Sequence, residues 1–251
     1  MENFGLYSKY YDLLYADKEY EKEAEYVMDL IRTFNKGTAS ILEFGSGTGK
    51  HGKLFKAGGF EHYGIERSNE MVEEAHKTGV ECEQGDITSF KLDKKFGVVI
   101  SLFHVISYLT TNKEVNECFT KANEHLEDGG LFIFDTWYTP AVYFNKPENR
   151  IRKVGNELLD VTRFASPAIH YNSNIVDVNF TVFIKEKADN RTTELVEKHP
   201  MRHFSIPEIA LFAEINGFAI ERIEEFLSGQ EPSENTWGVC FVLRKFKNIK
   251  K

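Results

Sequence analysis

Three glycines at alternate positions, Gly45, Gly47 and Gly49, follow directly after a short apolar run. That run, residues 39–44, has the length and composition of a buried strand in a parallel sheet. Glycines at such a turn let the backbone adopt positive φ, or lie against a ligand with no Cβ in the way. A segment compatible with a helix follows. The pattern predicts a strand, a tight turn and a helix start, which together form a nucleotide crevice at the carboxyl edge of an α/β sheet.

Two kinds of ligand fit this turn. Residues 47–52 match G-x-G-x-x-G, the pattern of dinucleotide-binding proteins, although that pattern alone is weak evidence. A pyrophosphate binds backbone N–H groups and a helix N-terminus, so an acidic neighbour does not help it. Glu43 stands just before the turn, and we expect its carboxylate at the mouth of the crevice. That position suits a ligand with a positive end, such as the ammonium group of a methionine moiety. A turn with no ligand is the third alternative.

Length and composition narrow the class of protein. The 251 residues can form one large α/β domain, and 41% hydrophobic with 28% charged residues is ordinary for a globular chain. A net charge of −8 argues against general affinity for nucleic acid. No apolar run approaches the roughly 20 residues of a membrane span, and no signal-peptide core is recognisable. The three cysteines are scattered, without metal-ligand spacing. We expect a cytoplasmic protein with no structural metal, no nucleic-acid partner and no membrane partner.

Helix and strand patterns alternate after the glycine turn, which is typical of a doubly wound sheet. Ser68 is a plausible N-cap for one of the helices. Glu66 ends one strand and the pair Gly85-Asp86 follows the next, so acidic side chains fall at successive strand ends. An acid at the first of these positions can accept hydrogen bonds from both ribose hydroxyls of an adenosine. The expected helices are 50–57, 69–77 and 112–126, and the expected strands are 62–66, 80–83, 96–102 and 131–135.

The segments on either side of this core have different patterns. Strand-like alternation in residues 157–164, 174–187 and 192–203 predicts three antiparallel strands, inserted to cover the crevice or to make a dimer contact. A helix that begins near Ser205 and a closing hairpin complete the chain. The first 33 residues have a helical pattern rich in tyrosine. Their rings can pack against the sheet, or form a lid whose faces attract a cationic ligand by about 0.5–2 kcal/mol.

On these residues the chain resembles the class I S-adenosylmethionine (SAM)-dependent methyltransferases. Motif I corresponds to Glu43-Phe-Gly-Ser-Gly-Thr-Gly49, and Gly64-Ile-Glu-Arg-Ser68 and Gly85-Asp86 extend the likeness. With Tyr11–Tyr15, the segment 101–109 and the inserted sheet, it is more narrowly similar to the nucleotide-linked (TDP) amino-sugar N,N-dimethyltransferases of deoxysugar biosynthesis. The resemblance implies an α/β, Rossmann-like seven-stranded methyltransferase sheet in a single domain, residues 1–251. Its parts would be a helical lid (1–36), a SAM-binding core (37–138), an inserted antiparallel sheet (139–204), and a last helix with the closing hairpin (205–246).

The resemblance also implies roles for particular residues. Within the SAM site, Glu66 would hold the ribose and Asp86 would accept a hydrogen bond from the adenine amine. The candidate catalytic groups are His104, Tyr108 and Tyr11. The candidate SAM-binding residues are Tyr11, Tyr15, Glu43, Gly45, Ser46, Gly47, Gly49, Glu66, Arg67, Met71, Gly85, Asp86, Ile87, Leu102 and Phe103. The candidate substrate-binding residues are Trp137, Tyr138, Arg152 and Arg202, the arginines as a phosphate clamp or as solvated residues of a strand face.

The chain departs from the family pattern close to the substrate. Motif I starts with Glu43 where the family usually has aspartate, and His104 and Ile106 stand where small polar residues are typical. The acceptor therefore stays open between the amino group of a nucleotide-linked sugar and a hydroxyl of another small, phosphorylated metabolite, such as a capsule or polysaccharide precursor. A hydroxyl acceptor would need a base, and His104 is the candidate. A nicotinamide-dependent oxidoreductase and a SAM-binding module without catalysis are further alternatives. A homodimer is plausible.

Overall fold

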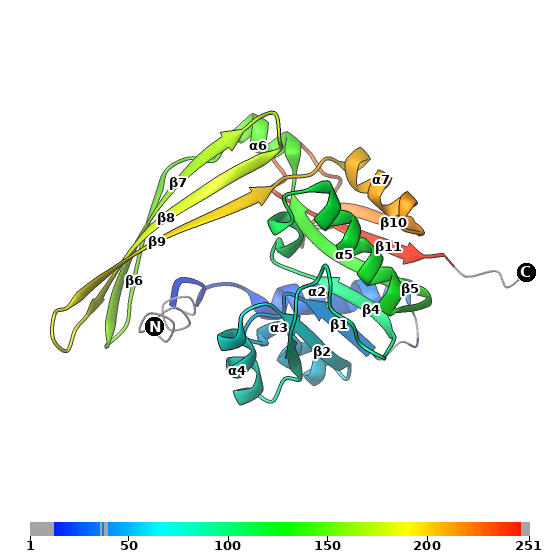
Figure 1. The fold of residues 1–251 in the computed structure, drawn as a ribbon, viewed down its shortest axis with the longest axis horizontal. Coiled ribbons are helices and arrows are strands. Elements are labelled where there is room, and N and C mark those ends of the chain that lie inside the picture. The colour runs from blue at the N-terminus through cyan, green and yellow to red at the C-terminus, as the bar shows by residue number, and fades with distance from the viewer. Residues whose placement is uncertain (1–12, 36, 38–39, 247–251) are drawn as a thin grey trace, which may run out of the picture.

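The computed structural model describes residues 13–35, 37 and 40–246, and it contains two sheets (Figure 1). Five neighbouring strands of the main sheet pair in parallel, and the strand that comes last in the chain pairs antiparallel with both of its neighbours. In spatial order this sheet consists of β3 (Cys82–Gln84), β2 (Glu61–Glu66), β1 (Ser40–Phe44), β4 (Phe96–Ser101), β5 (Leu126–Trp137), β11 (Gly238–Lys245) and β10 (Phe218–Glu225). The expected Rossmann-like seven-stranded sheet is confirmed.

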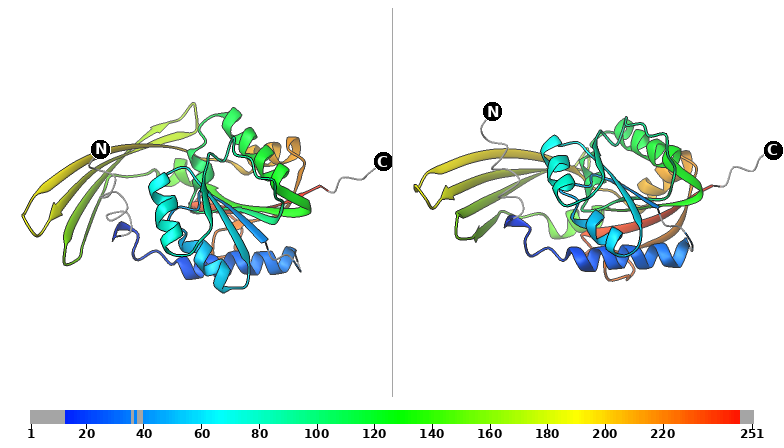
Figure 2. Two further views of the ribbon diagram at one scale, coloured as in Figure 1. Left: turned by 60° about the horizontal axis from the view of Figure 1, so that its bottom comes forward. Right: turned by 90° about the horizontal axis from the view of Figure 1, so that it is seen from below.

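Helices cover both faces of the main sheet. They are α2 (Tyr20–Phe34), α3 (Lys50–Ala57), α4 (Asn69–Lys77), α5 (Asn112–His125), α6 (Thr139–Asn145) and α7 (Ile206–Ile215), with a 3₁₀ turn η1 (Val105–Tyr108). Successive side chains of a strand point to opposite faces. In β1, Ile41 therefore packs with α2 and α3, whereas Leu42 and Phe44 pack with α5 and α7. Figure 2 shows α2 and α5 on opposite sides of the sheet.

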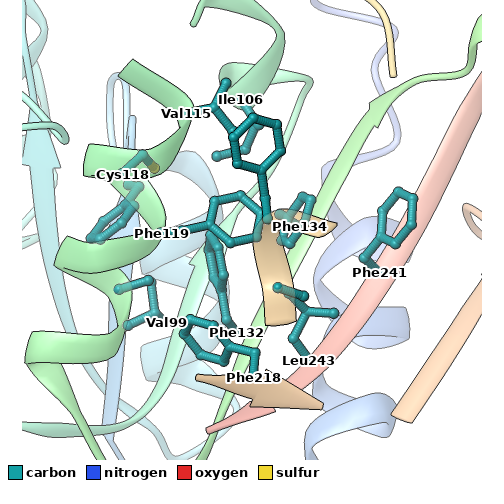
Figure 3. Close-up of a cluster of buried hydrophobic side chains, with 14 of the residues drawn as sticks. Val99, Ile106, Val115, Cys118, Phe119, Phe132, Phe134, Phe218, Phe241 and Leu243 are labelled. Carbon is teal, nitrogen blue, oxygen red and sulfur yellow. The ribbon is translucent and has the colours of Figure 1, made fainter. Parts of the chain in front are cut away.

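The core beneath α5 and α7 is strongly aromatic (Figure 3). The rings of Phe132 and Phe134 lie 4.6 Å apart, and Phe119 of α5 packs edge-on against both, at 5.3 and 5.5 Å. All three side chains are fully buried. Replacement of such a phenylalanine by alanine typically costs about 3–5 kcal/mol, so this cluster holds α5 firmly on the sheet.

Local signals place the helix starts that border the crevice. The hydroxyl of Ser68 accepts a hydrogen bond from the N–H of Met71, which confirms the expected N-cap of α4. Thr111 and Glu114 form a capping box at the start of α5. Helix α6 was not expected, and β5 begins at Leu126, directly after α5, instead of at residue 131. No helix in the described part of the chain is long and apolar enough to span a membrane.

The inserted antiparallel sheet is confirmed, with four strands where three were expected. It consists of β6 (Arg150–Gly155), β7 (Leu159–His170), β8 (Ile175–Glu186) and β9 (Thr192–Arg202). The unexpected strand β6 is a partly exposed edge strand rich in charge, so its sequence carries little hydrophobic alternation. The sheet extends away from the main sheet (Figure 1). Its apolar residues Val161, Val182 and Ile184 pack against Leu14 of the N-terminal segment.

Candidate active site

A cavity of about 950 Å³ lies between the carboxyl edge of the main sheet and the inserted sheet. One end is formed by the glycine turn after β1 and by the ends of β2 and β4; the other end is formed by β7, β8 and β9. Most of the residues expected in the site line it. They are Tyr15, Gly45, Ser46, Gly47, Glu66, Arg67, Met71, Gly85, Asp86, Ile87, Leu102, Phe103, His104, Tyr108 and Trp137.

The glycine turn has the conformation that its sequence predicts. Gly45, Gly47 and Gly49 all have positive φ, at 70°, 55° and 78°. A Cβ on Gly45 would lie 2.6 Å from a methyl carbon of Val105, so a side chain there is excluded by space as well as by conformation. Gly49 does not line the cavity, because it packs towards Val80 behind the turn. Its role is to let the chain pass closely at the start of α3.

Two carboxylates face the cavity from neighbouring strand ends. Glu66 accepts hydrogen bonds from the N–H groups of Gly47 and Ser68, each at 2.9 Å. Asp86 accepts from the N–H and the hydroxyl of Thr88, at 2.9 and 2.6 Å. Burial would raise the pKa of Asp86, but the hydrogen bonds from Thr88 outweigh it and hold this pKa below its usual value. Each carboxylate is thus fixed in place with lone pairs left for a ligand.

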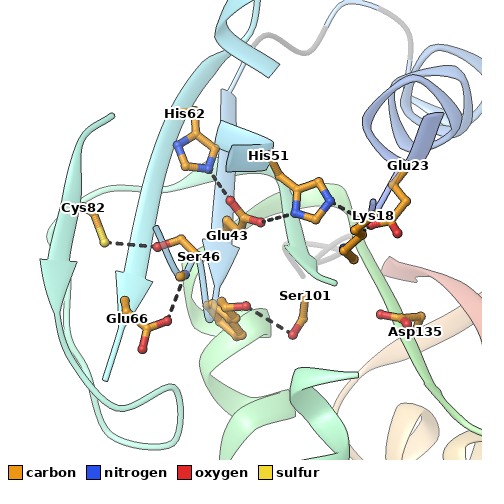
Figure 4. A network of polar contacts seen from close by, with 12 residues as sticks. Lys18, Glu23, Glu43, Ser46, His51, His62, Glu66, Cys82, Ser101 and Asp135 are labelled. Carbon is orange, nitrogen blue, oxygen red and sulfur yellow. Dashed lines mark hydrogen bonds and ion pairs between the residues drawn. The ribbon is translucent and has the colours of Figure 1, made fainter. Parts of the chain in front are cut away.

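Glu43 does not lie at the mouth of the crevice, and that expectation is wrong. Its carboxylate is 1% exposed and lies 2.7 Å from Nε2 of His62 and 3.6 Å from Nδ1 of His51 (Figure 4). The reason is strand alternation, since Glu43 shares with Ile41 the face of β1 that α2 and α3 cover. The two histidines compensate the burial of its charge.

This buried carboxylate belongs to a longer polar network that reaches the N-terminal segment. Nε2 of His51 lies 2.9 Å from a carboxylate oxygen of Glu23 on α2, and Glu23 is also paired with Lys18. Lys18 in turn lines the cavity, with its ammonium group 4.1 Å from the ring centre of Phe103. The network ties motif I to the segment expected to form a lid (Figure 4). Tyr11, expected in that lid, lies outside the described residues.

His104 lies at the end of β4 in a strained conformation. Phe103 and His104 have φ of 64° and 59°, which costs side-chain-bearing residues roughly 1–3 kcal/mol each and is typical of functional sites. Nδ1 of His104 lies 2.6 Å from Oδ2 of the fully buried Asp135. Burial would raise the pKa of Asp135, but the charge of His104 and the hydrogen bond from its N–H outweigh it and lower this pKa. The structure therefore presents to the cavity an imidazole in close contact with a buried carboxylate, although Nδ1 of His104 does not have the geometry of a hydrogen bond to it.

Aromatic rings form the wall next to this imidazole. Tyr15 packs edge-on against Phe103, with ring centres 5.3 Å apart, and Trp137 packs edge-on against His104 at 6.3 Å. The faces and edges of these rings surround the region between the glycine turn and the inserted sheet. Aromatic faces attract a cation by about 0.5–2 kcal/mol, so this wall suits a positively charged reacting centre.

Three of the four expected substrate residues lie outside the cavity. Arg152 is on the edge strand β6 and pairs with Asp17, Arg202 is buried against Glu208 and Asn112, and Tyr138 packs against the aromatic core. Arg202 points away because it is on the opposite face of β9 from His199. Sequence reasoning missed the side chains that the inserted sheet contributes instead. These are Arg163, Val178, Phe180, Glu197, His199 and Met201.

Comparisons with known proteins identify the family and the fold. Residues 41–130 match the family model described as "Methyltransferase domain". The chain is 31% identical, over 178 residues, to dTDP-3-amino-3,4,6-trideoxy-alpha-D-glucopyranose N,N-dimethyltransferase from Streptomyces venezuelae. The matched region covers 68% of this chain and 74% of that protein. The crystal structure of an S-adenosylmethionine-dependent methyltransferase from Clostridium acetobutylicum superposes with a TM-score of 0.82 at 17% identity, covering 97% and 99% of the two chains. Streptomyces venezuelae DesVI superposes with a TM-score of 0.80 at 24% identity, covering 98% and 99%.

Proposed function

Because the chain belongs to the class I SAM-dependent methyltransferases, we propose that it transfers methyl groups to the amino group of a nucleotide-linked sugar. The Streptomyces venezuelae relative is named for N,N-dimethylation of a dTDP-linked 3-amino sugar, which is the chemical class proposed here. The observation that carries the proposal is the continuous cavity, whose two ends differ in chemistry. The SAM-binding motifs form one end, and polar groups of the inserted sheet form the other, where an acceptor can approach.

The residues at the first end fit SAM. Gly45 and Gly47 leave the backbone bare beside the ligand, and the fixed carboxylates of Glu66 and Asp86 are the acceptors that ribose hydroxyls and an adenine amine require. When bound, SAM supplies an electrophilic methyl group on a positively charged sulfur. The chain's own contribution is to hold donor and acceptor in line, which can lower the barrier by about 7–11 kcal/mol.

The second end fits a phosphorylated acceptor through Arg163. Its guanidinium group lies 4.5 Å from the ring centre of Phe180 and donates to the hydroxyl of Tyr15 at 3.1 Å. It is the cation that the inserted sheet directs into the cavity, among the described residues. A stacked guanidinium keeps several N–H groups free to bind a phosphate. We assign it to the diphosphate of the nucleotide sugar, in place of Arg152 and Arg202.

Methylation of a hydroxyl is the second candidate function, and the contact between His104 and Asp135 favours it. A sugar hydroxyl is a poor nucleophile until a base removes its proton, whereas an amine in its neutral form attacks directly. An imidazole beside a buried carboxylate can serve as such a base once its Nδ1–H donates to that carboxylate.

One experiment tests both candidates. Calorimetric titration with SAM and S-adenosylhomocysteine, with NAD as control, first measures cofactor binding. The protein is then incubated with SAM and either a dTDP-3-amino-3,6-dideoxyhexose or the matching 3-hydroxy sugar, and products are identified by mass spectrometry. Gain of one or two CH₂ units on the amino sugar alone supports N-methylation. Gain on the hydroxy sugar alone replaces the proposal by O-methylation, and gain on neither, despite SAM binding, overturns both.

A further inference from the structure

The inner face of the inserted sheet combines apolar side chains with a few polar ones that line the cavity. Residues of β9 alternate, so Leu195, Glu197, His199 and Met201 share this face while Val196 and Lys198 point outward. The neighbouring strands cover the same face with buried valine and isoleucine side chains. Glu197 and His199, like Arg163 on β7, are polar groups among apolar neighbours on this face, and all three line the cavity. An apolar position would have served packing better, so these residues call for a functional explanation.

Glu197 and His199 form an ordered chain of polar groups with Tyr108. Nε2 of His199 lies 3.0 Å from a carboxylate oxygen of Glu197, and Nδ1 lies 3.3 Å from the hydroxyl oxygen of Tyr108. Tyr108 belongs to η1, so the chain of contacts joins the main sheet to the inserted one. The ring of Phe180 packs against His199 at 5.3 Å between centres and holds the imidazole in place.

The order of these groups fixes the positions of the protons. A carboxylate only accepts hydrogen bonds, so Nε2 of His199 carries the hydrogen that Glu197 receives. Nδ1 then has a lone pair and accepts from the hydroxyl of Tyr108. The remaining lone pairs of the Tyr108 oxygen are left to accept from a ligand in the cavity. Carboxylate, imidazole and hydroxyl stand in the order by which a hydroxyl proton is passed to a base.

We propose that Tyr108, His199 and Glu197 form a proton relay that removes the proton from the acceptor amine before methyl transfer. The inference rests on the proposed function and deepens it, because it assigns the step that an amino sugar requires. An amine whose pKa is near that of an α-amino group, about 8, is mostly protonated at neutral pH and cannot attack. The relay gives its proton a path away from the reacting centre.

Proton transfer comes first at the acceptor nitrogen, and methyl transfer follows. One N–H proton of the ammonium group passes to the Tyr108 oxygen while the phenolic proton passes to Nδ1 of His199, and the resulting imidazolium is paired with Glu197. The freed lone pair forms the N–C bond as the C–S bond of SAM breaks, with its electron pair left on sulfur. The imidazolium then releases its proton to solvent, since the side chains of His199 and Glu197 are 22% and 21% exposed.

The surroundings of Tyr108 allow its hydroxyl to pass a proton on without remaining ionised. The side chain of Tyr108 is 49% exposed, and its phenol stays protonated between transfers because even an unperturbed tyrosine has a pKa of about 10. Among the described residues, Tyr15 is a further titratable group beside Tyr108, and Arg163 lies on the other side of Phe180 from His199. This relay is separate from His104 and Asp135, which belong to the ends of β4 and β5.

The kinetic test compares Tyr108→Phe, His199→Gln and the double variant with Lys198→Gln, an outward-facing neighbour on β9. With a dTDP-3-amino-3,6-dideoxyhexose and saturating SAM, we expect each relay variant to lose about 100-fold in kcat near pH 6.5, without a further loss in the double variant. The loss should shrink above about pH 9, where the amine is already neutral. Lys198→Gln should match the wild type. Relay variants that match it too, or a loss equal at every pH, would overturn the relay.

A second measurement tests the relay without measuring enzyme turnover. Nitrogen NMR of ¹⁵N-histidine-labelled protein bound to S-adenosylhomocysteine reports which ring nitrogen of His199 is protonated. The relay requires hydrogen on Nε2, and a shift of the Nδ1 signal in Tyr108→Phe; a hydrogen on Nδ1 contradicts it. If the wild type methylates no amino sugar, the proposed function fails, and this signal still tests the relay geometry separately.

Discussion

Asp135 holds both the side chain and the backbone of His104. One carboxylate oxygen lies 2.6 Å from Nδ1 of the imidazole, and the other accepts a hydrogen bond from the His104 N–H at 3.1 Å. This double contact stabilises a residue whose φ of 59° would otherwise be unfavourable. A buried carboxylate at the end of β5 therefore fixes the position of the only catalytic candidate that stands at the end of β4, within the described residues.

Replacement of His104 distinguishes an amine acceptor from a hydroxyl acceptor. We expect His104→Gln to lower kcat by about 10²-fold or more if the acceptor is a hydroxyl, since a base would be lost. With an amine acceptor the same variant should stay largely active. Initial rates with the amino and hydroxy forms of one dTDP-sugar measure this, and His170→Gln, on the inserted sheet away from the cavity, is the control. A large loss with the amine would assign His104 to the N-methylation step.

Replacement of Arg163 should weaken the binding of the nucleotide sugar more than the binding of SAM. Loss of a charged hydrogen bond costs about 1.5–3 kcal/mol, so Arg163→Met should raise the KM for a dTDP-amino sugar by roughly 10- to 100-fold. Arg152→Met is the matched control, because Arg152 stands opposite Arg163 on the neighbouring strand but pairs with Asp17 outside the cavity. An amino glycoside without phosphate should show no difference between the two variants. An equal loss with that glycoside would exclude phosphate binding.

Alanine substitutions at Gly45 and Gly59 test the glycine turn through their effect on the free energy of unfolding. Both have positive φ, 70° and 89°, but a Cβ on Gly59 would meet nothing within 4 Å, whereas one on Gly45 would contact Val105. Gly59→Ala should cost only the conformational term, about 1–2 kcal/mol. Gly45→Ala should cost about 1–3 kcal/mol more from overpacking, and it should weaken SAM binding. Urea denaturation measures the difference. Equal losses would mean that Val105 moves aside freely.

His203 should make the fold sensitive to acid. Burial and the nearby charge of Arg202 lower the pKa of His203 from 6.5 to about 4. Between these values the unfolded chain binds a proton that the folded chain does not, so stability falls as pH falls through this window. The stability is fully present above about pH 6.5, and the loss approaches about 3 kcal/mol near pH 4. His203→Asn should flatten this part of the pH profile, measured by urea denaturation. An unchanged slope would show that other groups dominate.

Short-range patterns were enough to predict which residues meet at the glycine-turn end of the cavity. The glycines, Glu66, Asp86 and the Ser68 cap each lie at the end of a strand or shortly after it, and parallel strands bring their carboxyl ends to one edge of the sheet. Residues at that edge meet wherever the connections between strands are right-handed, which is the rule for such folds. Their convergence thus depends on the order of elements, which hydrophobic periodicity reveals.

The acceptor end could not be read in the same way. Glu197 and His199 are some 90 residues from Tyr108 in sequence (91 for His199), and only the curvature and position of the inserted sheet bring them together. A period of two shows that two strand residues share a face, but it does not show which face is turned to the cavity. For this reason the sequence could not separate two arginines of the inserted sheet. Arg163 lines the cavity, whereas Arg202 is buried against Glu208.

Sequence alone therefore determined the fold class, the cofactor and the residues of the glycine turn, because those depend on contacts between neighbours in the chain and on parallel strand order. Tertiary structure alone decided that Glu43 is buried between two histidines, and that His104 is held by Asp135. It also decided which polar groups of the inserted sheet face the acceptor. The physical reason is that a side chain's surroundings are set by the segment packed against it, and that segment is distant in sequence.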